Sequence, residues 1–115
     1  LYTERFDVEA VRMDDRLADV PALDLLRMDA EGSEGLALRG AARLIARSPR
    51  QRIVTEWSPA MLASRTDPVE IAAWLGAQGF RAWMIARRGR LEPVAIDALP
   101  GLPHGELVFS RQDIA

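Results

Sequence analysis

The sequence predicts an α/β fold with a mostly parallel sheet and an antiparallel strand at one edge. Short, mostly apolar runs at 23–28, 52–57 and 80–86 are typical of sheet strands. Stretches with helical periodicity separate these runs, and the connections are only a few residues long. An alternation of strands and helices is the sequence form of a parallel sheet. The last two strands are joined by a non-helical segment, so they could pair antiparallel at one edge.

The first apolar pattern of the chain is typical of a half-buried strand. Phe6, Val8 and Ala10 alternate with acidic residues, as they would if one face of the strand were buried. A turn is expected at 14–17, before the short apolar strand at 23–28.

Helical periodicity begins near residue 33 and continues to residue 47. Its apolar stripe comprises Leu38, Ala41, Ala42 and Ile45. Pro49 ends this helix, because a proline disfavours the helical conformation in the residue before it. Residues 52–57 are rich in β-branched side chains and predict the next strand, which Pro59 closes.

The clearest local signal is the start of a second helix. Asp67 suits the N-cap, Pro68 the first helical position, and Glu70 the third, from which it can bond back to the cap. Gly79 is the expected C-terminal stop. The remaining expected elements are a strand at 80–86, a turn at 88–89, a returning segment at 91–96, a loop at 101–105 and a strand at 107–109.

The composition excludes several classes of protein. Fifteen basic residues, all arginine, against 17 acidic residues give a formal net charge of -2, which argues against nucleic-acid and anionic-membrane partners. No run reaches the ~18 apolar residues of a spanning helix, and no signal-peptide pattern is present, so we expect a cytoplasmic protein. The absence of Cys and Lys excludes thiolate catalysis and a Schiff-base lysine. Carboxylates, arginines, hydroxyls and aromatics remain to carry any chemistry.

Three carboxylates are the candidate catalytic residues. Asp29 and Glu31 follow one predicted strand and Glu56 ends the next, and ligands in open α/β sheets bind beyond the carboxyl ends of strands. These side chains could act as a general base, position a substrate hydroxyl, or hold a divalent cation. The alternative is that Asp29 and Glu31 cap the following helix, whose dipole favours negative charge.

Residues next to the carboxylates are candidates for binding a substrate. Trp57 and Ser58 could line a ligand pocket, although Trp57 fits equally well as a packing aromatic at a strand end. His104 lies between a proline and a glycine and is expected to be a loop residue. Gly32 and Gly35 lack the full Gly-x-Gly-x-x-Gly pattern, so they are weak evidence for a phosphate site.

The stretch 23–34, which reads Leu-Asp-Leu-Leu-Arg-Met-Asp-Ala-Glu-Gly-Ser-Glu, resembles the signature of FkbM-type methyltransferases. The Leu-Arg-Gly-Ala at 38–41 fits the continuation of that signature, and 56–62 resembles the family's Glu-Phe-x-Pro region. The resemblance extends to the closing 107–111. It is most specific between Asp24 and Glu34.

The resemblance implies the carboxyl-terminal half of a class I, Rossmann-like methyltransferase fold, with residues 1–115 as a single partial domain. The implied activity is S-adenosylmethionine-dependent methylation of a hydroxyl on a sugar or secondary metabolite. Asp29 is then the first candidate base, with Glu31 and Glu56 supporting it or binding a metal. The cofactor's Gly-rich loop and ribose-binding acid belong to the other half of such a fold. A non-catalytic interaction module is the alternative function.

The same half-fold predicts an open sheet edge. The strand at 23–28 would expose its outer edge, and such edges recruit other chains. We therefore expect a homo-oligomer, unless the segment around 6–13 folds over that edge.

Overall fold

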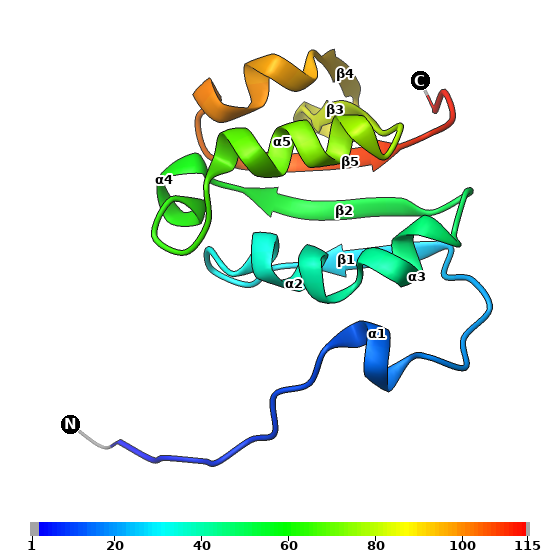
Figure 1. The fold of residues 1–115 in the computed structure, drawn as a ribbon. Coiled ribbons are helices and arrows are strands. Elements are labelled where there is room, and N and C mark those ends of the chain that lie inside the picture. Colours follow the sequence, from blue (N-terminus) through cyan, green and yellow to red (C-terminus); the bar gives the residue numbers. More distant parts are fainter. Residues whose placement is uncertain (1–2, 115) are drawn as a thin grey trace.

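The computed structural model describes residues 3–114, which form a five-stranded sheet in the order β1-β2-β5-β3-β4 (Figure 1). The strands are β1 (Leu25–Met28), β2 (Arg52–Trp57), β3 (Arg81–Ile85), β4 (Leu91–Val94) and β5 (Gly105–Ser110). The helices are α1 (Met13–Arg16), α2 (Glu34–Gly40), α3 (Ala42–Ala46), α4 (Pro59–Leu62) and α5 (Pro68–Ala77), with 3-10 turns η1 (Arg87–Gly89) and η2 (Ile96–Gly101). The α/β class is confirmed.

The expectation of a mostly parallel sheet is wrong. Only β1 and β2 pair in parallel, and the other three pairings are antiparallel. The reason is that β5 lies between β2 and β3 and runs opposite to both. Strands β1, β2 and β3 still point in one direction, as their helical connections require. An antiparallel strand does lie at one edge, but it is β4, which pairs with β3 rather than with β5.

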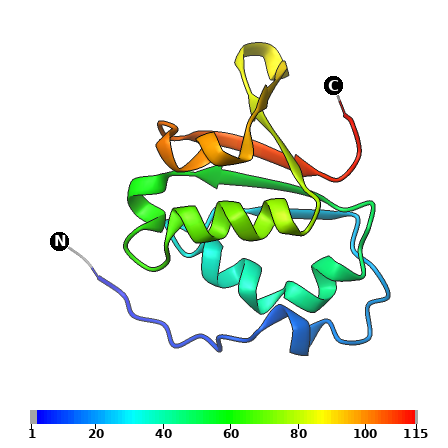
Figure 2. The ribbon, with the colours of Figure 1, turned by 45° about the horizontal axis from the view of Figure 1, so that its top comes forward.

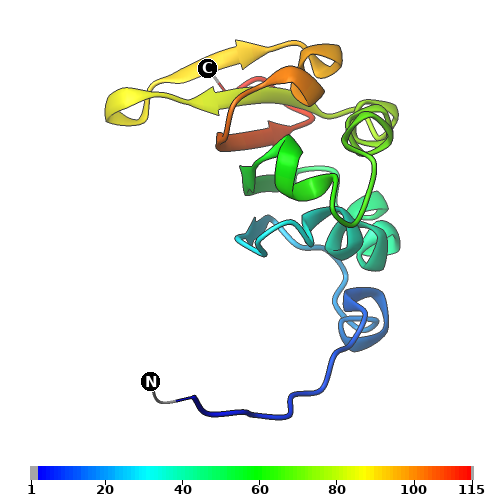
Figure 3. The same cartoon turned by 90° about the vertical axis from the view of Figure 1, so that its left-hand side faces the viewer.

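The helices α2, α3 and α5 gather on one side of the sheet, as the side view shows (Figure 3). Alternate residues of each strand point to these helices and form the hydrophobic core. Its most buried members include Leu38, Ile45, Ile53, Trp57, Leu75, Leu107 and Phe109. Each of these side chains has at most 1% of its surface exposed.

The opposite side of the sheet, which we call the open face, has no helix over it in the described part of the chain (Figure 3). Residues of neighbouring strands line up across it in rows of different character, first basic, then apolar, then acidic. From one end of the strands to the other, these rows consist of Arg52, Ser110 and Arg81, of Val54, Val108 and Trp83, and of Glu56 and Glu106. The carboxyl ends of β1 and β2 are therefore the acidic end of this face.

The single helix expected over 33–47 is two helices, because a buried acid from earlier in the chain caps the second. Asp14 is 4% exposed, and its carboxylate accepts the backbone N–H groups of Arg43 and Leu44 at 3.0 and 2.9 Å. These are orphan donors at the start of α3. The turn expected at 14–17 is instead the one-turn helix α1, which presents this acid.

The strand expected around Phe6 is also wrong. Residues 3–12 contain no strand or helix and are exposed throughout, with Phe6 77% and Val8 85% exposed. An apolar–polar alternation gives a strand only where another strand can pair with it, and this segment leads away from the sheet (Figure 1). It does not cover the outer edge of β1, where Leu25 is 58% exposed.

Several other local predictions are confirmed. Asp67 caps α5 by accepting the backbone N–H of Val69 at 2.9 Å. Glu70 does not make the expected bond back to the cap, because its carboxylate turns to the Arg39 guanidinium at 3.7 Å. Gly79 follows the helix with a φ of 88°, in the left-handed region that favours glycine. The predicted turn after β3 is the tip of a hairpin, which projects from the body of the molecule (Figure 2).

At the end of the sheet opposite the acidic row, Arg111 ties two helix ends together. Its guanidinium donates to the backbone carbonyls of Gln78, Ser48 and Ile45 at 2.7, 3.0 and 3.2 Å. It also lies 4.2 Å from the ring centre of Phe80. The fully buried amide of Gln51, near the same end, has no hydrogen-bond partner within residues 3–114, and nothing in the structure explains it.

Candidate functional site

A tight turn after β1 carries two of the three candidate carboxylates. The backbone N–H of Ser33 donates to the carbonyl of Ala30 at 3.1 Å, and the two central residues have positive φ, 51° at Glu31 and 99° at Gly32. Two positive φ values in succession are typical of a type I′ turn. A Cβ on Gly32 would lie 2.6 Å from the backbone oxygen of Met61, so only glycine fits against α4.

Glu34, which was not among the residues predicted for the site, stabilises this turn. Its buried carboxylate accepts the backbone N–H groups of Ala30 and Gly32 at 2.6 and 3.0 Å. The N-cap of α2 is Ser33. Neither Asp29 nor Glu31 is therefore the N-cap of α2, whereas the favourable interaction of their charges with its dipole stays a prediction.

The three predicted carboxylates lie together. Asp29, Glu31 and Glu56 each offer an oxygen within 4.8 Å of the others, and we call them the carboxylate cluster. Their proximity follows from the parallel pairing of β1 and β2, which brings the ends of both strands to one edge. Asp29 and Glu31 are exposed, whereas only 15% of the Glu56 side chain is. The spacing could suit a divalent cation, but exposed acids are also common without one.

Like charges at close range perturb the protonation of the cluster. A hydrogen bond with the Asp29 carboxyl raises the pKa of Glu56, and burial and the negative charges of Asp29 and Glu31 raise it further. These effects all favour the protonated form of Glu56 over its ionised form. The cluster is thus a pair of interacting carboxyl groups with a third acid beside it.

The two residues predicted to bind substrate have structural roles. Trp57 is 1% exposed, its indole N–H donates to the carbonyl of Leu99 at 2.8 Å, and its ring meets Phe109 edge to face. It points into the core, away from Glu56, so the packing alternative describes it. Ser58 caps α4 by accepting the backbone N–H of Met61 at 3.4 Å.

His104 is a neighbour of the cluster that the sequence reasoning assigned only to a loop. The loop is confirmed, but the imidazole Nε2 lies 3.3 Å from Oε1 of Glu56. The contact exists because β5 pairs antiparallel with β2, with Gly105 opposite Trp57. Only the sheet order could have revealed it, since the two residues are almost fifty positions apart in the chain.

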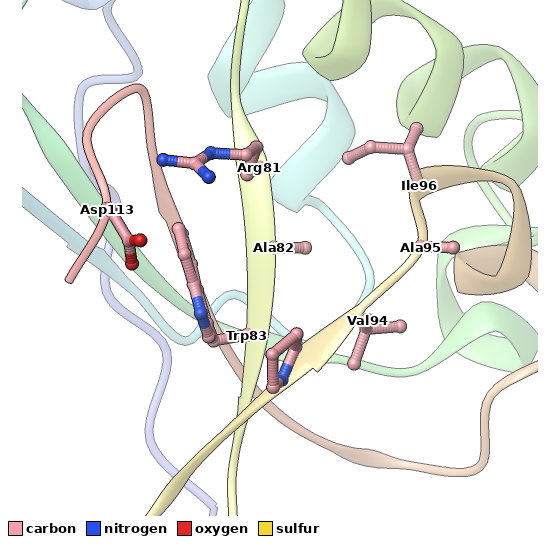
Figure 4. Close-up of a pocket in the computed structure, with 8 residues that line it drawn as sticks. Arg81, Ala82, Trp83, Val94, Ala95, Ile96 and Asp113 are labelled. Atoms are coloured by element: carbon pink, nitrogen blue, oxygen red, sulfur yellow. The ribbon is translucent and has the colours of Figure 1, made fainter. Parts of the chain in front are cut away.

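The residues of this edge do not by themselves fit S-adenosylmethionine. The turn after β1 offers no cradle for it, because Glu34 already occupies the N–H groups of Ala30 and Gly32 and Met61 abuts Gly32. A hollow of about 530 Å³ lies elsewhere, where Arg81, Trp83, Val94 and Asp113 surround the start of β3 (Figure 4). This hollow is at the opposite end of the sheet from the carboxylates. The turn after β1 therefore supplies acidic groups but no cradle for the methyl donor.

Most of the chain matches a known protein family. Residues 2–82, more than half of it, match the model of the methyltransferase FkbM domain. A search of curated proteins and a search of solved structures each found no match. No helix in the described part has the length and apolarity needed to cross a bilayer.

Proposed function

The chain belongs to the FkbM methyltransferase family, and on this premise we propose that its carboxylate cluster forms the acceptor side of a methyl-transfer site. The acceptor is a hydroxyl group of a sugar or secondary metabolite, and the family implies S-adenosylmethionine as the methyl donor. The observation that carries the proposal is the close approach of the Asp29 and Glu56 carboxyl groups at the carboxyl ends of adjacent parallel strands.

The chemistry required at the acceptor is the removal of one proton. When a hydroxyl oxygen forms a bond to a methyl carbon, its O–H bond must break and a base must take the proton. Asp29 suits this role because it is exposed at this edge of the sheet, where an acceptor can reach it. Glu56, which lies beside it, can accept a hydrogen bond from Asp29 once Asp29 is protonated. Glu31, two residues along the turn, can orient the acceptor.

We further propose that the chain is the carboxyl-terminal half of a class I methyltransferase domain. The open face and the free edge of β1 support this, because parallel strands are usually covered by helices on both sides. A half-domain that holds the methyl donor would pack on this face and pair with β1. In the chain alone, a second copy pairing at the same edge would give the homo-oligomer expected from the sequence.

The test is the methyl-transfer rate of the protein that carries this chain, compared between the wild type and Asp29→Asn. The substitution removes the base and nearly preserves its shape, so the rate should fall by roughly two to four orders of magnitude. The melting temperature should change little, because Asp29 is exposed and the turn is held by Glu34.

The matched control is Glu106→Gln. Glu106 carries the same charge at the same acidic end of the open face, but it lies outside the carboxylate cluster and 4.0 Å from Arg27. The control should keep most of the wild-type rate. An Asp29→Asn protein as fast as the control would remove Asp29 from the chemistry and favour a non-catalytic interaction module.

A further inference from the structure

One polar contact of the carboxylate cluster comes from outside the segment that defines the family. His104 lies beyond residues 2–82, the range that the FkbM domain matches, so the match gives it no role. The antiparallel pairing of β5 with β2 nevertheless brings its loop to the end of β2. The imidazole Nε2 is 3.3 Å from Oε1 of Glu56.

The difference in exposure between His104 and Glu56 indicates that their contact serves positioning rather than stability. His104 is 60% exposed and Glu56 only 15%. A contact made by such an exposed side chain contributes little to stability, about 0–1 kcal/mol. The more buried partner, in contrast, is a long side chain whose orientation decides whether its carboxyl group stays beside Asp29.

Glu56 needs two partners to keep one orientation. Asp29 lies beside its carboxyl group, while the charges of Asp29 and Glu31 repel it whenever it is ionised. The His104 imidazole, 3.3 Å from Oε1, contacts it from outside the cluster. An imidazole can supply an N–H donor whether it is neutral or protonated.

We propose that His104 is a positioning residue of the acceptor site, which holds Oε1 of Glu56 so that the carboxyl group of Glu56 stays beside Asp29 while the acceptor reacts. This inference rests on the proposed function. His104 acts through Glu56 and need not touch the acceptor, so its loss should lower kcat more than it raises KM.

The test compares three substitutions at one position. His104→Ala removes the donor, and kcat should fall about 10- to 100-fold, the scale of a misplaced catalytic group. In His104→Gln, the side-chain amide nitrogen can occupy nearly the place of Nε2, so kcat should recover most of the loss. In His104→Asn, the side-chain amide nitrogen lies at the place of Nδ1 and does not reach Glu56. This variant should therefore behave like His104→Ala. The melting temperatures of all three should match the wild type.

A second readout needs no activity. Carbon-13 NMR of the Glu56 carboxyl in the 115-residue chain follows its titration directly. The charge of protonated His104 lowers the pKa of Glu56, so His104→Ala should shift its titration to higher pH. An unchanged titration would mean that the two groups do not interact in solution, and it would overturn the inference.

The outcomes separate the two proposals. If Asp29→Asn leaves the rate intact, the proposed function fails, and the role of His104 fails with it. If Asp29→Asn slows the reaction but His104→Ala does not, only the inference about His104 is overturned. Equal losses in the glutamine and asparagine variants would also overturn it, because a positioning donor requires that glutamine be better.

Discussion

The polar side chains at the two ends of the sheet have opposite kinds of neighbours. At one end, Arg111 donates to three backbone carbonyls, of Ile45 in the last turn of α3 and of Ser48 and Gln78, which follow α3 and α5. Cations are stabilising at helix C-termini, and here the cation also stacks on Phe80. At the other end, Asp29, Glu31 and Glu56 crowd like charges within 4.8 Å of one another.

The difference distinguishes residues kept for stability from residues kept for chemistry. The Arg111 end adds donors to carbonyls at the ends of two helices, two of which, those of Ser48 and Ile45, also accept a backbone N–H group. The carboxylate end raises the pKa of Glu56 through the hydrogen bond with Asp29, burial and the repulsion of like charges, which costs stability at neutral pH. Perturbed titration beside a strand end is a probabilistic sign of a functional site. Three substitutions sharpen this comparison.

Arg111→Met should have the largest effect on stability. It keeps most of the side chain's length but removes the three charge-assisted hydrogen bonds and the contact of the cation with Phe80. We expect the free energy of unfolding to fall by about 2–4 kcal/mol, measured by urea denaturation. Arg81→Met is the matched control, because Arg81 is exposed and stacks on Trp83 more loosely, at 5.4 Å. Equal losses in both variants would contradict the special role of Arg111.

Asp14→Ala should cost less, about 1–2 kcal/mol, the usual scale of a helix cap. Burial alone would raise the pKa of Asp14, but the backbone N–H groups of Arg43 and Leu44 and the Arg43 guanidinium outweigh it and lower the pKa below its ordinary 3.8. The stabilisation is therefore present above pH 3.8 and is lost as the pH falls through the lowered value.

The measurement is urea denaturation of Asp14→Ala and the wild type at neutral and acidic pH. The difference in the free energy of unfolding between the wild type and Asp14→Ala should be constant near pH 7 and should become smaller at acidic pH. Asp15→Ala, at an exposed neighbour 3.7 Å from Arg43, should change stability little at any pH. A difference that becomes larger in acid would contradict the lowered pKa.

Glu56→Gln should have the smallest effect, and an effect of opposite sign. The folded protein holds the Glu56 proton more tightly than the unfolded chain does, so wild-type stability falls as the pH rises from 4.5 through the raised pKa. Glutamine mimics the protonated acid and lacks this fall. The free energy of unfolding of Glu56→Gln, relative to that of the wild type, should therefore increase as the pH rises from 4.5 through the raised pKa. That of Glu106→Gln should show no such increase. Parallel pH profiles for Glu56→Gln and the wild type would contradict the perturbed titration.

Much of the secondary structure could be predicted because its signals are local. The cap at Asp67, the glycine at Gly79 and the β-branched run of β2 each act over a few residues. Proximity of Asp29 to Glu56 was predictable for a similar reason, since one helical connection makes their strands parallel neighbours.

The features that escaped prediction all depend on distant partners. The split between α2 and α3 depends on Asp14, roughly thirty residues earlier, and the misread strand near Phe6 has nothing to pair with. His104 reaches Glu56 only because β5 enters the middle of the sheet. A pattern in one segment holds no information about which partner the rest of the chain will provide.

The position of β5 has a consequence for how the chain folds. The last of the five described strands is the central one, and within residues 3–114 it alone joins the pair β1 and β2 to the hairpin of β3 and β4. While a ribosome still holds residues 105–110, the other four of these strands can form only two separate pairs with each other. Completing the sheet then requires closing a loop of roughly fifty residues between Glu56 and Glu106, the kind of distant pairing that slows folding. Until β5 is in place, the edges of β2 and β3 that it will cover remain unpaired, and they can bind chaperones or each other.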